Sequence, residues 1–473
     1  MESAKANPHC DYRPQDDYPY TLTNLVQISE QVNSLNNHIR DLFKIRSNLL
    51  HRSNQLRSLA STLPPEILSN IFRKLVDPDF ALGEPSAPFR LRQSFTLSSV
   101  STHWRNAALG TPQLWEDMHC IVPNNNQSVD NLISLLQHCS SCAHTLNILL
   151  SLPSFENDRE VLHTLTQELF SSEIKEKVRS LTLCWPPAHW LSMIFRLPIL
   201  RSLFILGYVA SDRDNFRLYT LATVPTSLRS LHVEDVPMFD TPILRLCQNV
   251  EFCKYRPGSP IVPVSYSEPL ILGKLERLIM PAGHGLQTVT SAGNLLMPSL
   301  KHLELEHRGF HDLDFYPDII IHFCRQVSKT LLGLTIRCSG PQWSVDALRL
   351  LFKSLPHLRE FHAEGWIVAP INVIQALISY KDSNREIDCL PRLTTLSLHE
   401  EPNDGGSLPS RSYFDLVLEL LKCRRTNEGP LFHVDIAGRS LIGLGPELEE
   451  ELKSVVENYQ ILVTNRKQKL PWL

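Results

Sequence analysis

Leu200-Arg201-Ser202-Leu203-Phe204-Ile205 places aliphatic side chains at its first, fourth and sixth positions, so that Leu203 and Ile205 would share one face of an extended chain and alternate with residues of the other face. This alternation is typical of a β-strand with one buried face. Eight further segments follow the same pattern, those at 250 and 358 less closely. The nine copies begin at residues 178, 200, 228, 250, 275, 300, 331, 358 and 393, in steps of 22 to 35 residues.

A six-residue strand cannot bury its own leucines, so each copy must stack on the next one. The pattern Leu-x-x-Leu-x-Leu resembles the strand segment of leucine-rich repeats, which implies a solenoid with parallel strands on its concave side. Prolines at 198, 298, 356 and 391 predict a rigid turn before four of the strands. Helical stretches are expected between strands, for example at Ser344–Ser354 and Asn372–Tyr380. The sequence therefore predicts an α/β fold, and the repetition disfavours a compact, non-repeating sheet.

Residues between the leucines of each copy point away from the core and line the predicted concave face. Basic side chains dominate the middle copies and acidic side chains the later ones. This face is either an ordinary solvated surface or the binding surface for a protein substrate. The candidate substrate-binding residues are Lys254, Arg256, Arg277, Glu304, Glu306, Glu360 and Glu364.

A second organised stretch runs from Leu63 to Trp115 and reads as three short helices. Its first helix would begin at Pro64-Pro65 and carry a stripe of apolar residues at helical spacing, namely Ile67, Leu68, Ile71, Phe72 and Leu75. Residues 77–93 are expected to form a loop. Leu97–Ala108 would form the second helix, and Thr111-Pro112 would start the third. Because so small a unit buries little surface alone, part of its apolar surface is expected to belong to a partner.

The same residues resemble the F-box in the variant common among fungal F-box-like proteins. The resemblance rests on Leu63-Pro64-Pro65-Glu66-Ile67-Leu68, on Val100-Ser101-x-x-Trp104-Arg105, and on Pro112-x-Leu114-Trp115. It implies docking to the Skp-type adaptor of a cullin-RING (SCF-type) ubiquitin ligase. The adaptor-facing or core positions that it implies are Leu63, Pro64, Ile67, Leu68, Ile71, Val100, Trp104 and Trp115.

Residues 22–62 show a heptad pattern that predicts a long helix ending before Pro64. Apolar residues fill most first and fourth positions of the heptad, while Arg46 and Ser53 interrupt the first positions in the second half. Two interpretations remain open, a homodimeric coiled coil and an amphipathic helix folded back on its own chain. The heptad residues are Leu25, Ile28, Val32, Leu35, Ile39, Leu42, Leu49 and Leu56.

The remaining divisions follow from composition. Residues 1–21 are polar and proline-containing and are expected to be disordered. Residues 63–118 would form the F-box-like unit, 119–445 the repeat domain, and 446–473 a C-terminal cap. The chain has 473 residues, a net charge of −4 and eleven cysteines without a disulfide framework. These values predict a cytoplasmic or nuclear protein that binds neither nucleic acid nor membrane.

His138, Cys139, Cys142 and His144 form a dense cluster of potential metal ligands. A structural zinc site needs a second ligand pair, so buried or loop thiols are the favoured interpretation. No phosphate-binding loop or catalytic motif is apparent, and no cofactor, metal or catalytic residue is predicted. The leading hypothesis is a non-catalytic substrate receptor of an SCF-type ligase. The alternatives are a self-associating scaffold outside any ligase and a zinc- or thiol-dependent enzyme using Cys139 and Cys142.

Overall fold

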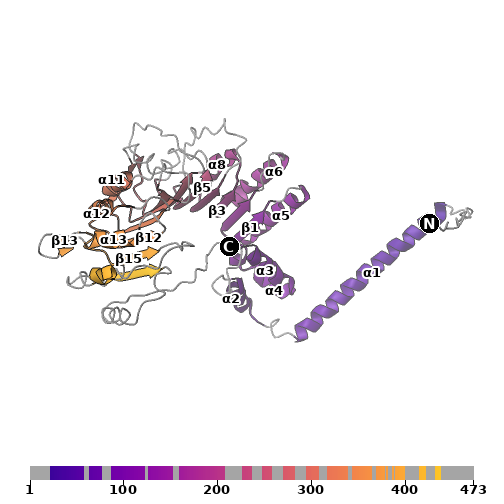
Figure 1. The fold of residues 1–473 in the computed structure, drawn as a ribbon. Helices are drawn as coiled ribbons and strands as arrows, with labels where there is room; N and C mark the ends of the chain where they lie inside the picture. Colours follow the sequence, from indigo (N-terminus) through magenta and orange to yellow (C-terminus); the bar gives the residue numbers. More distant parts are fainter. Residues whose placement is uncertain are drawn as a thin grey trace, which may run out of the picture.

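The computed structural model contains one long parallel sheet, preceded by a group of helices (Figure 1). The expected disordered stretch 1–21, the expected helix end at 58–62, the expected loop residues 77–86 and the expected cap 446–473 lie outside the residues that the structure describes. The described residues are 22–57, 63–76, 87–122, 126–152, 159–207, 226–236, 248–257, 270–282, 295–307, 317–338, 343–364, 369–378, 380–381, 386–387, 389–399, 415–421 and 432–437.

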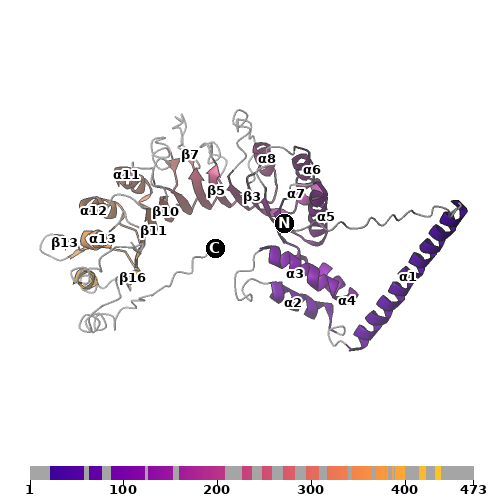
Figure 2. The same cartoon turned by 45° about the vertical axis from the view of Figure 1, so that its right-hand side comes forward.

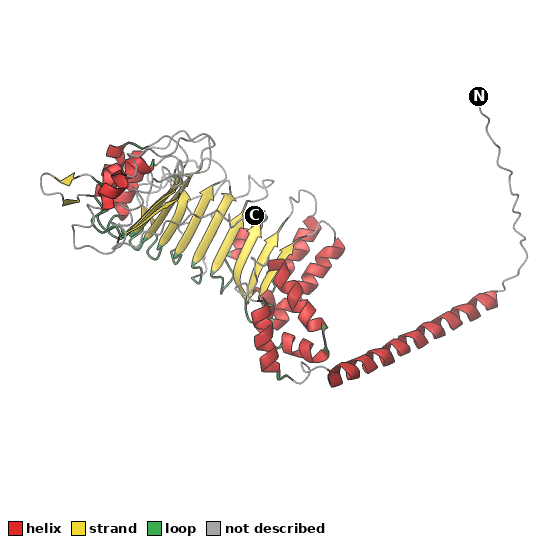
Figure 3. Cartoon of the chain, turned by 60° about the horizontal axis from the view of Figure 1, so that its bottom comes forward, coloured by secondary structure: helices red, strands yellow, loops and turns green. Residues whose placement is uncertain are grey.

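The main sheet has twelve strands among the described residues, and every neighbouring pair is parallel. Its strands lie side by side in one long sheet (Figure 3), and their order in the sheet follows the chain. They are β1 (Asp117–Ile121), β2 (Leu146–Ser151), β3 (Val178–Cys184), β4 (Ser202–Leu206), β5 (Ser230–Val236), β6 (Phe252–Pro257), β8 (Arg277–Pro281), β10 (His302–His307), β11 (Gly333–Cys338), β12 (Glu360–Glu364), β15 (Thr395–His399) and β16 (His433–Ala437). Two small sheets pair β7 (Leu270–Ile271) with β9 (Leu295–Leu296), and β13 (Tyr380–Lys381) with β14 (Glu386–Ile387).

All nine repeat copies form strands of this sheet, which confirms the predicted α/β fold with parallel strands. The aliphatic positions of the copies are the core of the sheet; Leu200, Leu203 and Ile205, for example, are all buried. Each strand buries these side chains against those of its neighbours, as the repeat pattern predicted. The strands β1, β2 and β16 extend the sheet beyond the nine copies at its two ends.

All four predicted proline turns are present before their strands, and in three of them the closing hydrogen bond has good geometry. Leu300, Leu358 and Leu393 donate their backbone N–H groups to the carbonyl oxygens of Met297, Leu355 and Leu390, at 3.1 to 3.2 Å. Each turn thus has a proline at its second position, where the fixed φ of proline is already correct. The turns set the point at which each of these strands starts.

Helices lie on the outer side of the curved sheet, and the strands form its inner side (Figure 2). Ser344 caps α12 by accepting a hydrogen bond from the Ala347 N–H, as expected for a helix beginning at that serine. The helix α13 begins at Pro370 and ends at Leu377, so Tyr380 belongs to β13 rather than to the helix as predicted. The helices are α5 (Asn126–Cys142), α6 (Arg159–Leu169), α7 (Ser172–Lys175), α8 (Ala188–Ile194), α11 (Pro317–Val327), α12 (Val345–Lys353), α13 (Pro370–Leu377) and the segment 415–421.

The stretch from Leu63 to Trp115 forms α2 (Pro65–Val76), α3 (Ala87–Ser99), α4 (Thr102–Leu109) and the short 3-10 helix η3 (Pro112–Leu114). Two predictions were wrong here. Residues 87–93, expected in a loop, are the first turns of α3, and the expected helix from Leu97 to Ala108 is broken. The break occurs because the Ser101 side chain accepts a hydrogen bond from the Trp104 N–H and caps a new helix.

This helical unit is fixed to the first strand of the sheet and to α5. The ring of His138 of α5 packs against the rings of Phe95 and Trp115, with centroid distances of 5.6 and 4.8 Å, and those two rings also contact each other at 5.2 Å. The Arg90 guanidinium lies 2.7 Å from the Asp117 carboxylate at the start of β1. These contacts hold the helical unit against the end of the sheet.

The helix α1 (Leu22–Arg57) stands away from the rest of the described chain (Figure 2). Its described side chains from residue 26 to 50 are exposed. In this structure the helix is therefore not folded back on its own chain, which was one of the two interpretations of the heptad pattern.

Candidate interaction surfaces

The helix α2 carries two apolar stripes on different sides. Leu68, Phe72 and Val76 face the interior, and the Phe72 ring packs against that of Trp104 of α4 with a centroid distance of 5.1 Å. The second stripe consists of Ile67, Ile71 and Leu75, which we call the α2 stripe. These three residues are 40 to 54% exposed. Three large apolar side chains in consecutive turns of one helix thus remain uncovered.

The eight residues predicted to face the adaptor fall into two groups. Pro64, Ile67, Ile71 and Val100 are exposed, and Leu63 and Trp104 are partly buried. By contrast, Leu68 and Trp115 are fully buried, and the Trp115 indole donates a hydrogen bond to the Ala108 carbonyl at 2.9 Å. These two residues therefore belong to the internal core and can support a binding surface only indirectly.

On the concave face, strand register aligns the polar positions into rows that cross the sheet. One such row lies near the carboxyl ends of the strands. From β4 to β6 it contains Leu206, Glu234 and Arg256, and from β10 to β15 it contains Glu306, Arg337, Glu364 and His399. On β8 the residue paired with Glu306 is Pro281. Because Pro281 has no long polar side chain, it leaves a gap in this row of charges.

Five residues of this row form a chain of ion pairs, which we call the charge ladder: Glu234, Arg256, Glu306, Arg337 and Glu364. Arg256 contacts Glu234 at 3.4 Å and reaches across β8 to Glu306 at 2.5 Å. Arg337 lies 3.8 Å from Glu306 and 2.7 Å from Glu364. Charges of alternating sign are thus linked from β5 to β12.

Glu304, from the neighbouring row, is joined to the charge ladder. Arg277 contacts it at 3.3 Å, and Arg337 forms an additional ion pair with it. Glu304 and Glu306 are only 5 and 7% exposed. Carboxylates this deeply buried depend on their partners to remain ionised at low energetic cost.

At the β5 end of the charge ladder, the pKa of Glu234 is lowered to about 2. The largest cause is the His232 side chain, whose Nε2 lies 3.1 Å from the carboxylate; burial acts in the opposite direction, and Lys254 and Arg256 lower the pKa further. The Lys254 ammonium is 3.0 Å from the same oxygen. Glu234 is therefore held as an anion by three neighbouring side chains.

The predicted basic residues lie on β6 and β8 and the predicted acidic residues on β10 and β12, as their order in the sequence requires, but Glu304 and Glu306 are buried rather than solvent-facing. Parallel register places basic residues of β6 and β8 within reach of acidic residues on β10, so that most of the predicted charges neutralise one another. Glu234 and Arg337, which link the charge ladder, were absent from the predicted set. Among the described residues, no ion pair with Glu360 is present. The Glu360 side chain and the His302 ring both lie close to Gly333, in space that is open because glycine has no Cβ atom.

The cluster of His138, Cys139, Cys142 and His144 lies at the C-terminal end of α5. Cys139 is buried inside α5, and its pKa is raised to about 12 by burial and by the nearby Cys120 and Cys142. A thiol in this environment remains protonated at neutral pH and is a poor metal ligand or nucleophile. No group of three or more potential ligands is placed to hold a metal ion in the described part of the chain.

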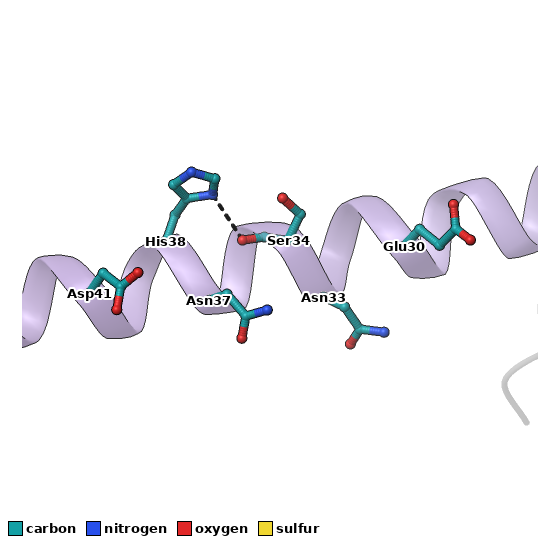
Figure 4. A pocket seen from close by; sticks show the side chains of 6 residues that line it. All are labelled: Glu30, Asn33, Ser34, Asn37, His38 and Asp41. Atoms are coloured by element: carbon teal, nitrogen blue, oxygen red, sulfur yellow. Dashed lines mark hydrogen bonds between the residues drawn. The ribbon is translucent and has the colours of Figure 1, made fainter.

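A shallow hollow along α1 is lined by Glu30, Asn33, Ser34, Asn37, His38 and Asp41 (Figure 4). All six side chains are exposed and come from one face of a single helix. His38 contacts the Ser34 carbonyl within that helix at 3.0 Å. Because a second wall is lacking among the described residues, the hollow marks the polar face of α1 rather than a ligand site.

No protein-family model matches the sequence, and no curated protein matches it. Among solved structures, the chain is similar to a structural-genomics target from Bacteroides fragilis, with 12% identity, a TM-score of 0.29 and coverage of 72% of each chain. Within the described residues, helices long and apolar enough to span a bilayer are absent.

Proposed function

We propose that this protein is the substrate-recognition subunit of an SCF-type cullin-RING ubiquitin ligase. In this proposal the unit of residues 63–118 binds a Skp-type adaptor, through which it reaches the cullin scaffold. The concave face of the sheet binds an unidentified protein substrate. The chain itself catalyses no reaction and acts in the cytoplasm or nucleus by holding its substrate near the ubiquitin-charged enzyme.

The uncovered α2 stripe is the observation that carries this proposal. Ile67, Ile71 and Leu75 remain exposed although the adjacent side of the same helix is packed in the core. Contiguous exposed apolar residues of this kind are typical of protein interaction sites. They coincide with the segment whose sequence resembles an F-box, and Pro64 and Val100 are exposed in the same unit.

The connection between the two proposed binding surfaces supports the same role. Arg90, Phe95 and Trp115 of the helical unit contact Asp117 and His138 next to the first strands. A receptor that presents its substrate at a defined distance needs such a fixed connection. On the concave face, Arg277, Arg337 and Glu364 are the most exposed members of the ion-pair network and are the best placed to contact a substrate.

The test is adaptor binding by purified Ile71→Asp protein. The substitution removes an apolar hot-spot contact and places a carboxylate in the proposed interface. We therefore expect the affinity for the adaptor to fall by at least about 30-fold, which corresponds to roughly 2 kcal/mol of binding free energy. The matched control is Leu350→Asp, because Leu350 is a half-exposed leucine on α12, remote from α2 in the sequence. Circular dichroism verifies that both variants fold. Equal adaptor affinity for wild type, I71D and L350D would refute the proposal.

A further inference from the structure

The helix α1 presents an uncovered apolar seam along most of its length. The described seam residues Ile28, Val32, Leu35, Ile39, Leu42 and Leu49 are 44 to 64% exposed. They occupy alternating first and fourth heptad positions and so lie on one side of the helix. The residues in Figure 4 lie on the opposite, polar side. A helix with this pattern requires a helical partner to cover the seam.

The distribution of charge along α1 indicates which partner fits. Residues 22–39 contain one acidic residue, Glu30, and no lysine or arginine. Residues 40–57 contain five basic residues against the single Asp41, giving a net charge of +4. The two halves of the helix therefore carry net charges of opposite sign, so that α1 is electrostatically complementary to a reversed copy of itself.

We propose that α1 pairs with α1 of a second copy of this chain in an antiparallel, two-stranded coiled coil. With the two helices overlapping over residues 24–57, Ile39 faces Leu42 of the second copy, and Val32 faces its Leu49. Arg46, the charged residue of the seam, faces Leu35 of the second copy. A parallel pair would instead place Arg46 against Arg46 and the two +4 halves side by side, which is unfavourable.

An antiparallel pair has a consequence for the whole assembly. The helical units that follow α1 would lie at opposite ends of the coiled coil, separated by about 54 Å for 36 residues rising 1.5 Å each. The two α2 stripes and the two concave faces would then belong to units at opposite ends of the coiled coil. This inference does not rest on the proposed ligase role, because it concerns α1 alone.

The first experiment is sedimentation velocity of the full-length protein at tens of micromolar. We expect a dimer for the wild type. Leu35→Asp with Leu42→Asp should give a monomer, whereas the control Asn33→Asp with Asn37→Asp, on the polar side, should remain dimeric. A monomeric wild type, a species larger than a dimer, or a dimer that survives both seam substitutions would overturn the proposal.

The second experiment determines the orientation. A photo-reactive benzoylphenylalanine replaces Ile28, and the cross-linked peptides of the dimer are identified by mass spectrometry. The antiparallel pair predicts cross-links from position 28 to peptides within residues 47–57. Cross-links between two peptides that both contain position 28 would show a parallel pair and overturn the assigned orientation. Adaptor binding by I71D is a separate measurement, so failure of either proposal is recognised independently.

Discussion

Replacing Arg256 with methionine removes one of the two cations of the charge ladder while keeping most of the side-chain volume. Arg256 is the closest cation to Glu306, at 2.5 Å, and also contacts Glu234 at 3.4 Å. The side chains of Arg256 and Glu306 are 26 and 9% exposed. After the substitution, Glu306 keeps only Arg337, at 3.8 Å, among its described ion-pair partners. A nearly buried carboxylate would thus lose its main source of stabilisation.

Removing one partner of a buried ion pair typically costs about 3–5 kcal/mol. We expect about 2–3 kcal/mol here, because Arg256 is partly solvated and Arg337 still compensates part of the charge. The matched control is Lys301→Met. Lys301 pairs with Glu276 at 2.7 Å, but both side chains are about half exposed, so its loss should cost roughly 0–1 kcal/mol.

The assay combines urea unfolding with hydrogen exchange of the amides in β6, β8 and β10. Exchange is needed because neighbouring repeats can open separately, so that one global free energy of unfolding is not assured. The double variant Arg256→Met with Glu306→Met should be more stable than R256M alone, since it also removes the unpaired carboxylate. If R256M is no more destabilising than K301M, the charge ladder is only a solvated surface and the reasoning is wrong.

Two further predictions concern single residues. Because the folded pKa of Glu234 is lowered to about 2, its stabilising effect is complete above the unfolded value of 4.5 and is lost as pH falls towards 2. The difference in urea midpoint between wild type and Glu234→Gln should therefore shrink from pH 6 to pH 3, and a constant difference would contradict the assignment. Gly207→Ala should cost about 1–3 kcal/mol, since Gly207 has a φ of +63° and a Cβ there would lie 2.6 Å from the Trp185 ring. Gly273→Ala is its control, having no atom within 4 Å of the added carbon, and equal thermal midpoints for the two variants would exclude the strain. The other two predictions are the loss of adaptor binding in I71D and the loss of the dimer in the α1 seam variant.

Much of the fold is determined by local sequence. In each repeat the spacing of leucines dictates a strand with one buried face, and the proline turn before several strands sets where it begins. The long helix from residue 22 follows equally from its heptad pattern. These features depend on the intrinsic period of strands and helices, so that nearby residues suffice to predict them.

The two interaction surfaces depend on contacts between distant residues. Sequence alone assigns Ile67, Leu68, Ile71 and Phe72 to one apolar stripe, but packing against Trp104 decides that Leu68 and Phe72 face inward. The break at Ser101 was also missed, because a single capping serine inside an apolar pattern outweighs the helical period.

The pairing of charges was the least predictable feature. Arg256 and Glu306 are 50 residues apart, and only the register of three adjacent strands brings them together. Pro281 then matters because it leaves β8 without a side chain that could intervene. The sequence by itself determined which residues lie on the concave face, since strand alternation is local. Only the tertiary structure decided that these charges neutralise one another, since ion pairing depends on distances set by the lateral stacking of whole repeats.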